Sequence, residues 1–337
     1  MSVSALSSAG LQSPLVVADI GGTNARFGWV EQPGQAVSHV HTLPTADFSG
    51  PGQAMQHYLS ALPAEHRARA AAQGLRAGWA LATAVDGDQV AMTNNHWRFS
   101  CRQEAERLQL SALHVYNDFE ALACSLPHLG AHQLRSWDDR LPRYDAPLAV
   151  VGPGTGLGVA GMVPTRQGWQ PLPGEGGHMT LAAHDDFEAA LLQEARQQWP
   201  HVSAERFLSG IGLPLLHACV CRVSGWGLHI DNTEDLVLQG LAGDTAARRT
   251  LEVFCAMLGG HAGNVALVLG ARGGVFIGGG LVPRLGNLFF ESEFRRRFEH
   301  KGRFASYLRD IPTVLITDTL VALHGVSCAV AQGARPS

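Results

Sequence analysis

The sequence predicts an α/β protein built from two halves that repeat one strand–turn–strand pattern. In the first half a buried strand, Leu15–Ile20, enters the Gly21-Gly22 turn and returns as Arg26–Val30. In the second half the corresponding strand, glycine-rich turn and returning strand are Leu148–Val151, Gly152–Gly156 and Gly158–Val163. The two units lie about 130 residues apart, so we interpret them as matching halves of a duplicated architecture.

Helices and strands alternate after the first unit. We expect helices at Gln53–Leu62, Cys101–Leu110 and Phe119–Leu126, and strands at Ala77–Ala82 and Leu113–Tyr116. Ser100 and Gln103 form a capping-box start for the second of these helices.

Helices dominate after the second unit. We expect helices at Phe187–Gln198, from Asp244 or Thr245 to Gly270, and at Leu320–Ala331, with strands at Val275–Ile277 and Thr313–Ile316. Gly259, Gly260 and Gly263 lower the helix propensity of the long segment, which predicts the close approach of a neighbour.

Length and composition indicate two domains. A chain of 337 residues is too long for one ordinary core. We expect a flexible tail over residues 1–13, a small α/β domain over 14–128 plus 318–337, and a large α/β domain over 129–317. No stretch approaches the pattern expected of a membrane span or a signal peptide, so we expect a cytoplasmic protein.

Charge and cysteine content exclude several classes of function. The net charge of −4 gives no electrostatic reason to bind nucleic acid or an anionic membrane. Lys301 is the single lysine and lies outside any glycine-rich loop, so ATP binding would proceed without a Walker-A lysine. The six cysteines form no Cys-x-x-Cys pair, which favours reduced core cysteines over a zinc site.

The segment Asp19–Arg26 is the first candidate site. Adjacent glycines after a buried strand let backbone N–H groups approach an anion, and Thr23 adds a hydroxyl. A tight hairpin without a ligand is the alternative. Asp19 favours a site, because a carboxylate in an apolar strand needs a partner, and Mg²⁺ reached directly or through water would supply one.

Two further glycine-rich turns follow strands. Gly152–Gly158 is not a dinucleotide fingerprint, because Leu157 occupies the third glycine position and a strand follows. Its Gly-Thr pair repeats that of the first half, and two such turns can grip a triphosphate from both sides. Gly278–Gly280 follows a buried strand and could support a planar base, or could be a flexible connection.

Acidic and amide side chains form a second group of candidates. Asn117-Asp118 stands between a strand and a helix, so either residue could cap that helix, or Asp118 could accept a proton from a substrate hydroxyl. Glu175 and His178 lie three residues apart in a glycine-rich loop, a pattern that seldom forms for packing reasons. Glu205 lies in the first turn of a helix capped by Ser203, where a surface glutamate is also favourable.

These stretches resemble the bacterial glucokinases of the actin-like, ribonuclease-H-like ATPase fold, outside the ROK group. The resemblance runs from about residue 15 to about residue 331. The matching stretches are Asp19–Arg26, Ala91–Trp97, Asn117–Ala121, Gly152–Ala160, Leu172–His178, His201–Gly210, Gly274–Pro283 and Lys301–Phe304. Pro153 departs from the pattern, since a small residue is expected there, and the cysteine-rich zinc motif of the ROK group is absent.

The resemblance implies a two-domain duplicated fold with an interdomain cleft and a role for each candidate. It implies ATP-dependent phosphorylation of D-glucose in glycolysis, with Mg²⁺ carried by the nucleotide, in a homodimer. Asp118 is the implied general base. The implied glucose ligands are Asn95, Asn117, Asp118, Glu175, His178 and Glu205. The implied ATP-binding residues are Ala18, Asp19, Ile20, Gly21, Gly22, Thr23, Gly154, Thr155, Gly156, Gly278, Gly279 and Gly280.

Two other functions remain open from the sequence. One is a kinase for another hexose, such as mannose or fructose, because an epimer such as mannose differs from glucose only in the direction of one hydroxyl. The other is a nucleotide switch or sugar-responsive regulator without catalysis. Asp118 and the Glu175/His178 loop argue against the second, because a bare switch needs no pocket for a polyol.

Overall fold

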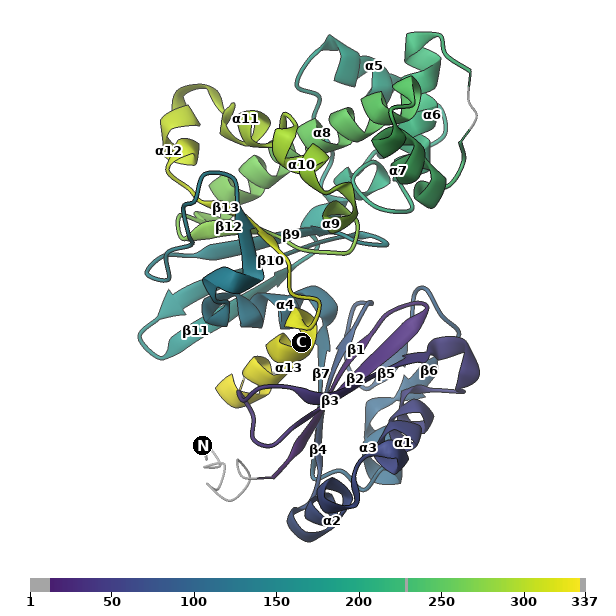
Figure 1. Cartoon of the computed structure of the whole chain (residues 1–337), viewed down its shortest axis with the longest axis vertical. Coiled ribbons are helices and arrows are strands. Elements are labelled where there is room, and N and C mark those ends of the chain that lie inside the picture. Colours follow the sequence, from purple (N-terminus) through teal and green to yellow (C-terminus); the bar gives the residue numbers. More distant parts are fainter. Residues whose placement is uncertain (1–12, 228–229, 334–337) are drawn as a thin grey trace. The chain divides into compact units, whose positions relative to one another are not determined.

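The computed structural model describes residues 13–227 and 230–333 (Figure 1). The tail expected over residues 1–13 therefore lies, apart from Ser13, outside the described residues. The chain divides into two compact units. The first contains the described residues up to His128, the segment Thr165–Pro171 and the chain from Asp318 onward, and the second contains Leu129–Pro164 and Leu172–Thr317.

The first unit is a five-stranded sheet in the order β3-β2-β1-β4-β7. The strands are β1 (Leu15–Ile20), β2 (Asn24–Val30), β3 (Ser38–Pro44), β4 (Arg76–Leu81) and β7 (Ala112–Asn117). β1, β4 and β7 run parallel, whereas β2 returns antiparallel to β1. The central strands are apolar on both faces, as expected of parallel strands covered by helices on both sides.

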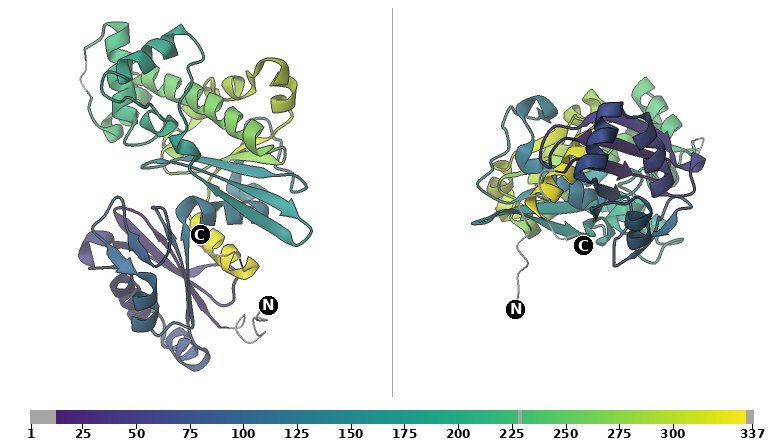
Figure 2. Two further views of the ribbon diagram at one scale, coloured as in Figure 1. Left: turned by 180° about the vertical axis from the view of Figure 1, so that it is seen from behind. Right: turned by 90° about the horizontal axis from the view of Figure 1, so that it is seen from below.

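Helices cover both faces of this first sheet (Figures 1 and 2). They are α1 (Pro51–Ala61), α2 (Ala64–Gln73), α3 (Cys101–Arg107), α4 (Asp118–Ser125) and α13 (Val321–Gln332). A small hairpin of β5 (Gln89–Ala91) and β6 (Arg98–Ser100) lies beside them. α13 packs so closely on α4 that a Cβ at Gly325 would lie 2.0 Å from the backbone oxygen of Ala121.

The second unit repeats this topology in a six-stranded sheet, ordered β11-β10-β9-β12-β13-β8. The strands are β8 (Leu134–Ser136), β9 (Leu148–Pro153), β10 (Leu157–Thr165), β11 (Gly168–Gly174), β12 (Gly274–Ile277) and β13 (Thr313–Ile316). β9, β12 and β13 are parallel, and β10 returns antiparallel to β9. The order β10-β9-β12-β13 thus corresponds to β2-β1-β4-β7, and the predicted duplication is confirmed.

The helices of the second unit form the thicker layer of its core. They are α5 (Asp186–Ala195), α6 (Leu213–Ser224), α7 (Thr233–Ala242), α8 (Thr245–Leu269), α9 (Val282–Leu285), α10 (Asn287–Glu291), α11 (Phe294–Glu299) and α12 (Ala305–Arg309). Figures 1 and 2 show α5 to α8 together on one side of the sheet. Their inward side chains and those of β9 and β12 build one continuous apolar cluster.

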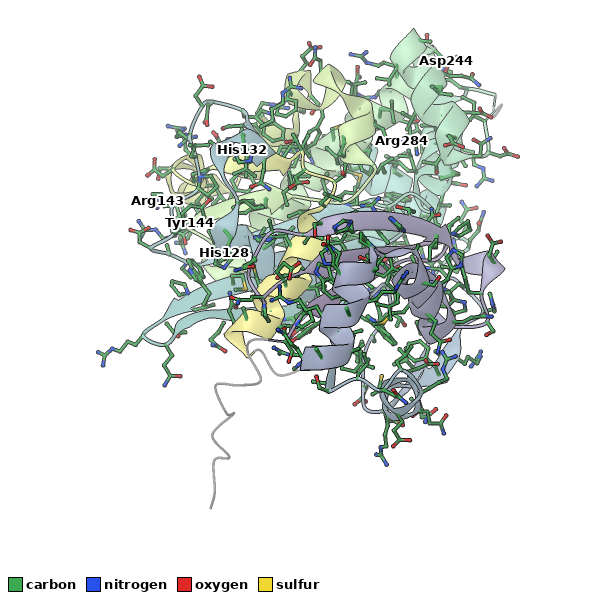
Figure 3. All side chains as sticks on the ribbon, turned by 60° about the horizontal axis from the view of Figure 1, so that its bottom comes forward. His128, His132, Arg143, Tyr144, Asp244 and Arg284 are labelled. Carbon is green, nitrogen blue, oxygen red and sulfur yellow. The ribbon has the colours of Figure 1, made fainter. Side chains whose placement is uncertain are left out.

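Helix α8 is the central element of that layer. The side chain of Asp244 caps it by accepting from the Ala247 N–H at 2.8 Å (Figure 3), and left-handed Gly270 ends it. A Cβ at Gly259 would lie 2.1 Å from the backbone oxygen of Phe294 in α11. Gly263 is likewise close to α11, since a Cβ there would lie 2.5 Å from the backbone oxygen of Phe298. The predicted close approach is therefore confirmed at Gly259 and Gly263 but not at Gly260, where a Cβ would meet no atom within 4 Å.

Helix α8 also corrects one expectation. It has 25 residues and a window of mean hydropathy 1.4, long and apolar enough to cross a membrane by length and composition. In the structure 72% of that window is buried inside the protein, as in the core helix of a folded domain.

Other elements were not predicted from the sequence. They are β3, β8, β11, the β5–β6 hairpin, α2, α6, α7 and the short helices α9, α10, α11 and α12. Thr165–Pro171 is grouped with the first unit, although we had assigned it to the large domain. This segment is the tip of the β10–β11 hairpin, and by strand pairing it continues the sheet of the second unit.

Candidate active site

The first unit gathers its candidate residues at one edge of its sheet. Because β1, β4 and β7 are parallel and in register, Ile20, Leu81 and Asn117 end neighbouring strands side by side. The glycine turn after β1 and Asn117-Asp118 after β7 therefore follow the carboxyl ends of strands of the same sheet. This edge is where open α/β sheets bind ligands.

The Gly21–Thr23 turn is held by its neighbours rather than by its own side chains. The Gly21 N–H donates to the Asn24 oxygen at 2.9 Å, and the Thr45 hydroxyl donates to the Gly22 oxygen at 2.8 Å. A Cβ at Gly22 would lie 2.9 Å from Asn94, so glycine is required for this close approach. The turn is thus a constrained backbone surface of the kind that binds phosphate.

Asn95 contributes to the same turn. Its Nδ2 donates to the Gly21 oxygen at 3.0 Å, and its Oδ1 accepts from the Trp97 N–H at 2.9 Å. The resemblance implied a sugar contact for Asn95. The geometry shows it fastening the turn after β1 to the loop before β6.

Asp19 is a carboxylate at the end of an apolar strand, cross-strand from Arg26. Burial raises the pKa of Asp19 above its usual range, and the charge of Arg26 opposes the rise. Arg26 itself donates to the Thr319 oxygen at 2.6 Å. A carboxylate kept in a place that disfavours its charge is a candidate for binding a cation.

The residues described in the structure include no group of three or more His, Cys, Asp or Glu side chains that could hold a metal ion. The single carboxylate of Asp19 beside a glycine turn nevertheless fits Mg²⁺. This ion is commonly bound through one or two carboxylates, with phosphates and water supplying the other ligands.

Asn117 and Asp118 have separate positions in the structure. Asn117 is the N-cap of α4, and its Oδ1 accepts from the N–H groups of Phe119 at 2.9 Å and Glu120 at 3.3 Å. Its Nδ2 donates to the Thr83 oxygen at 3.3 Å, at the end of β4. Asp118 is the first residue of the helix, partly exposed, with its Oδ1 3.0 Å from the Phe119 nitrogen.

The second unit brings its two glycine-rich turns together. The Gly154 N–H donates to the Gly156 oxygen at 2.9 Å, closing the turn after β9. The turn after β12 lies against the end of β9, because the Leu281 N–H donates to the Pro153 oxygen at 3.1 Å. Gly279 has a φ of +76°, and a Cβ there would lie 2.3 Å from that same oxygen.

Pro153 therefore has a structural place. It is buried as the last residue of β9, opposite Leu157 of β10, and its carbonyl accepts from the turn that follows β12. The residue that departs from the family pattern thus joins the two glycine turns.

Glu175, His178 and Glu205 lie together in the second unit. A short antiparallel contact aligns their two segments: the Ala204 N–H donates to the Met179 oxygen at 2.8 Å. His178 Nε2 lies 3.9 Å from Glu175 Oε2, and His178 Nδ1 lies 4.0 Å from Glu205 Oε1. The exposed fractions of the His178 and Glu175 side chains are 59% and 66%, so both are open to a ligand.

The surroundings of Glu205 differ from those predicted. It lies in a single 3₁₀ turn, Ala204–Arg206, where we had expected a helix, and Ser203 precedes that turn without a side-chain capping bond. Its side chain is 26% exposed. Its Oε2 accepts from the Leu157 N–H at 2.8 Å, directly after the Gly154–Gly156 turn. The Glu205 carboxylate therefore contacts both His178 and the backbone directly after the phosphate turn. We call Glu175, His178 and Glu205 the acidic cluster.

The sequence did not predict a small cavity of about 190 Å³ beside Glu205. Arg206 lies over the Trp199 ring at 3.7 Å on its wall, and Ile211 is 63% exposed. The Ile211 N–H donates to the Thr155 oxygen at 3.2 Å. The only signal in the sequence is the Gly210-Ile211-Gly212 run, where an apolar residue stands between glycines.

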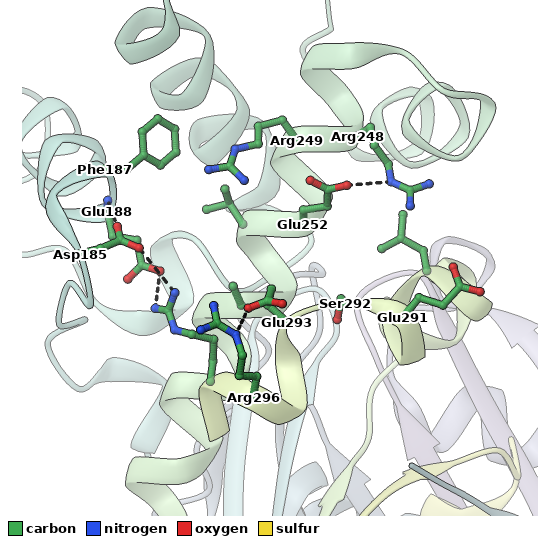
Figure 4. A pocket seen from close by; sticks show the side chains of 14 residues that line it. Asp185, Phe187, Glu188, Arg248, Arg249, Glu252, Glu291, Ser292, Glu293 and Arg296 are labelled. Atoms are coloured by element: carbon green, nitrogen blue, oxygen red, sulfur yellow. Dashed lines mark hydrogen bonds and ion pairs between the residues drawn. The ribbon is translucent and has the colours of Figure 1, made fainter. Parts of the chain in front are cut away.

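A larger cavity of about 500 Å³ lies among α5, α8, α10 and α11 (Figure 4). None of the predicted site residues lines it. Its walls carry ion pairs, Arg248 with Glu252 and Arg296 with Glu293 among them. In these pairs each charge is balanced by an opposite charge in the wall of the cavity. We therefore keep the glycine turns and the acidic cluster as the candidate site.

Comparison with known proteins finds relatives that match nearly the whole chain. The family model described as Glucokinase matches residues 16–333. The glucokinase of Chromobacterium violaceum is 44% identical over 96% of this chain and 91% of the relative. That of Paramagnetospirillum magneticum is 45% identical over 93% of this chain and 96% of the relative. The crystal structure of a glucokinase from an Antarctic psychrotroph superposes with a TM-score of 0.83 at 36% identity, covering 95% of this chain and 99% of the other.

Proposed function

Because the chain belongs to the glucokinase family, we propose that it transfers the terminal phosphate of ATP to D-glucose and forms glucose 6-phosphate. The fold expected from the resemblance, the two-domain actin-like ATPase fold, is confirmed with the family. The observation that carries the proposal is the position of Glu205. Its carboxylate reaches His178 on one side and, on the other, the backbone N–H of Leu157, which directly follows the Gly154–Gly156 turn.

The sugar ligands are proposed from both units. In the second unit Glu175 and Glu205 offer carboxylate acceptors, and the ring nitrogens of His178 lie close to both. Each carboxylate can accept hydrogen bonds from two adjacent hydroxyls, which suits a polyol. In the first unit Asn117 and Asp118 add an amide and a carboxylate at the end of β7.

Asp118 is the proposed general base. A sugar hydroxyl is a weak acid, so a carboxylate within reach removes its proton as the new P–O bond forms. The bond between the γ-phosphorus and the bridging oxygen of ATP breaks in the same step, and ADP leaves. Such a transfer depends on positioning and charge neutralisation more than on covalent chemistry.

The nucleotide ligands are proposed at the glycine turns. Backbone N–H groups of the turns Gly21–Thr23 and Gly154–Gly156 would bind the phosphates, apart from those of Gly21 and Gly154, which donate inside their own turns. Gly278–Gly280 would lie under the adenosine. Mg²⁺ would accompany ATP and neutralise its phosphate charge, with Asp19 as the protein group that holds it. Asn95 supports this assembly through its bond to Gly21.

We propose a cytoplasmic enzyme that acts in glycolysis as a homodimer. Supporting the first of these, the six cysteines are all free thiols in the structure, as expected in a reducing compartment.

The test is whether ATP turnover depends on the sugar. ADP release is measured with MgATP alone and after adding glucose, mannose or fructose to the same enzyme. We expect glucose to raise the rate by orders of magnitude, because a positioned hydroxyl is the acceptor. Fast ADP release that ignores every hexose would favour the nucleotide switch, and a preference for mannose or fructose would change the substrate.

A further inference from the structure

We infer that Gly156, assigned above to the phosphates of ATP, also positions the sugar ligand Glu205, so that one carboxylate connects the sugar site to the phosphate turn. This inference rests on the proposed function. It concerns the second unit alone, since every residue that carries it lies there.

The first step is the position of Glu205 Oε2. It accepts from the Leu157 N–H at 2.8 Å, and Leu157 is the first residue of β10 after the turn. The other oxygen, Oε1, lies 4.0 Å from His178 Nδ1 in the sugar cluster. The orientation of the carboxylate toward the sugar is therefore set by the backbone of the phosphate turn.

The second step is the room that Gly156 leaves. A Cβ built on Gly156 would lie 2.4 Å from Glu205 Oε2 and 3.3 Å from its carboxyl carbon. Atoms at that distance overlap, so any larger residue forces the Glu205 carboxylate out of its place. Gly156 does not have positive φ, so backbone conformation is not what requires glycine there.

The third step is a matched control in the same turn. Gly154 lies two residues earlier, also lacks positive φ, and a Cβ there would meet no atom within 4 Å. An alanine at position 154 changes the turn and its contacts with ATP in a comparable way, but leaves Glu205 in place. The two substitutions thus separate an effect on phosphate binding from an effect on Glu205.

A fourth observation concerns the backbone that carries Glu205. The segment that carries Glu205 is fastened to the turn on its far side, where the Gly210 N–H donates to the Gly154 oxygen at 2.8 Å. The Ser209 hydroxyl donates to the backbone oxygen of Glu205 at 2.7 Å and fixes the backbone of the 3₁₀ turn. An alanine at position 156 therefore displaces the Glu205 carboxylate through its side-chain torsions and not by moving its backbone.

The consequence is a coupling between the two substrates. A sugar that binds Glu205 fixes the acceptor of the Leu157 N–H and so orders the phosphate turn, and a nucleotide that orders the turn fixes Glu205 for the sugar. Such coupling is reciprocal by thermodynamic necessity.

The experiment measures glucose binding without nucleotide by calorimetry, for the wild-type chain, Gly156→Ala and Gly154→Ala. We expect Gly156→Ala to weaken glucose binding by about ten-fold or more, as for the loss of one charge-assisted hydrogen bond. Gly154→Ala should leave the glucose dissociation constant within about two-fold of wild type. Thermal unfolding of all three proteins shows whether each variant is folded.

A double-mutant cycle excludes a merely structural effect of the alanine. In a Glu205→Ala background there is no carboxylate to displace, so adding Gly156→Ala should change the glucose dissociation constant by less than about two-fold. Fully additive effects would overturn the inference, as would equal glucose affinities of Gly156→Ala and Gly154→Ala. If Gly156→Ala is not folded, Gly156→Ser in the same cycle replaces it, and the same outcomes apply.

The failure of this inference can be told from the failure of the proposed function. Wild-type glucose phosphorylation is measured first on the same preparation. If the wild-type protein neither binds nor phosphorylates glucose, the proposed function fails, and this inference with it. If the wild-type protein does both and the two glycine variants behave alike, only the inference fails.

Discussion

The side chain of Asn117 caps helix α4, and Asp118 follows it as the first helical residue. Asn117 Oδ1 accepts from the backbone N–H groups of Phe119 and Glu120 at 2.9 and 3.3 Å. The sequence left open which of the two residues was the cap. The structure assigns that role to Asn117, so the carboxylate of Asp118 is not what begins the helix.

This division leads to opposite expectations for the two residues. Asp118→Asn removes the proposed base while it keeps size and most hydrogen bonds, so kcat should fall by about 10²–10⁴. Thermal unfolding should stay near wild type, and glucose should still bind. A coupled ADP assay and calorimetry on one preparation measure these quantities.

Asn117→Ala is the matched comparison for the cap. Loss of the capping side chain should lower the free energy of unfolding by about 1 kcal/mol. If Asp118→Asn keeps more than about a tenth of the wild-type kcat, outside the usual range for a general base, Asp118 is not the base and Glu175 becomes the next candidate. A fall of kcat that only follows the loss of folded protein would also show that Asp118 is not the base.

Glu205→Gln tests another of the proposed sugar ligands. It replaces a carboxylate by an amide of equal size, so the KM for glucose should rise by about ten- to a hundred-fold. The KM for ATP should change much less, because the amide oxygen can still accept from the Leu157 N–H. Initial rates with each substrate varied in turn give both constants, and an unchanged glucose KM would leave Glu205 as a purely structural residue.

Asp19→Asn should stabilise the protein while it impairs activity. Burial raises the pKa of Asp19 above 3.8, so its charge is disfavoured in the folded state. The penalty is absent below the unfolded pKa and grows as the pH rises above it toward the folded pKa, so the thermal midpoint of the variant should exceed that of wild type at pH 7. The difference should vanish as the pH falls below the ordinary value of 3.8.

Activity separates the two roles of Asp19. If the carboxylate holds Mg²⁺ with the nucleotide, the asparagine variant should need more Mg²⁺ for half-maximal rate at fixed ATP. A variant that is both less stable at pH 7 and unchanged in its Mg²⁺ dependence would contradict this interpretation.

His261 should make the protein sensitive to acid. It is buried on α8, and burial lowers its pKa from 6.5 to about 4. The unfolded chain binds the proton near pH 6.5 and the folded chain does not, so stability falls as the pH drops from 6.5 toward 4. The shift corresponds to about 3 kcal/mol over that interval.

His261→Leu removes this proton-linked loss. Urea unfolding at pH 7 and pH 4.5 should show a smaller decrease for this variant than for wild type. The exposed His132, in the same unit, provides the control substitution His132→Leu. An equal loss of stability in all three proteins would show that other groups cause the acid sensitivity.

The sequence by itself determined the parts of this protein that depend on near neighbours along the chain. Short apolar runs predicted β1, β9, β12 and β13, and Asp244 and Gly270 predicted the ends of α8. Repetition of one strand–turn–strand pattern predicted two halves of equal topology, and the order of the strands confirmed it. The family followed from motifs whose order and spacing are also properties of the chain alone.

Tertiary structure alone decided which distant residues meet. β8 was not predicted, because a strand of three residues at the edge of a sheet is defined by its pairing with β13 rather than by its own pattern. The structural role of Asn95 depends on a hydrogen bond from its amide to Gly21, 74 residues away in the chain. Glu205 resembled an ordinary surface glutamate until the backbone of Leu157 and the space beside Gly156 fixed its direction. Local sequence predicts which backbone conformation a segment prefers, but a site depends on hydrogen bonds and close contacts between segments, and these exist only after the chain has folded.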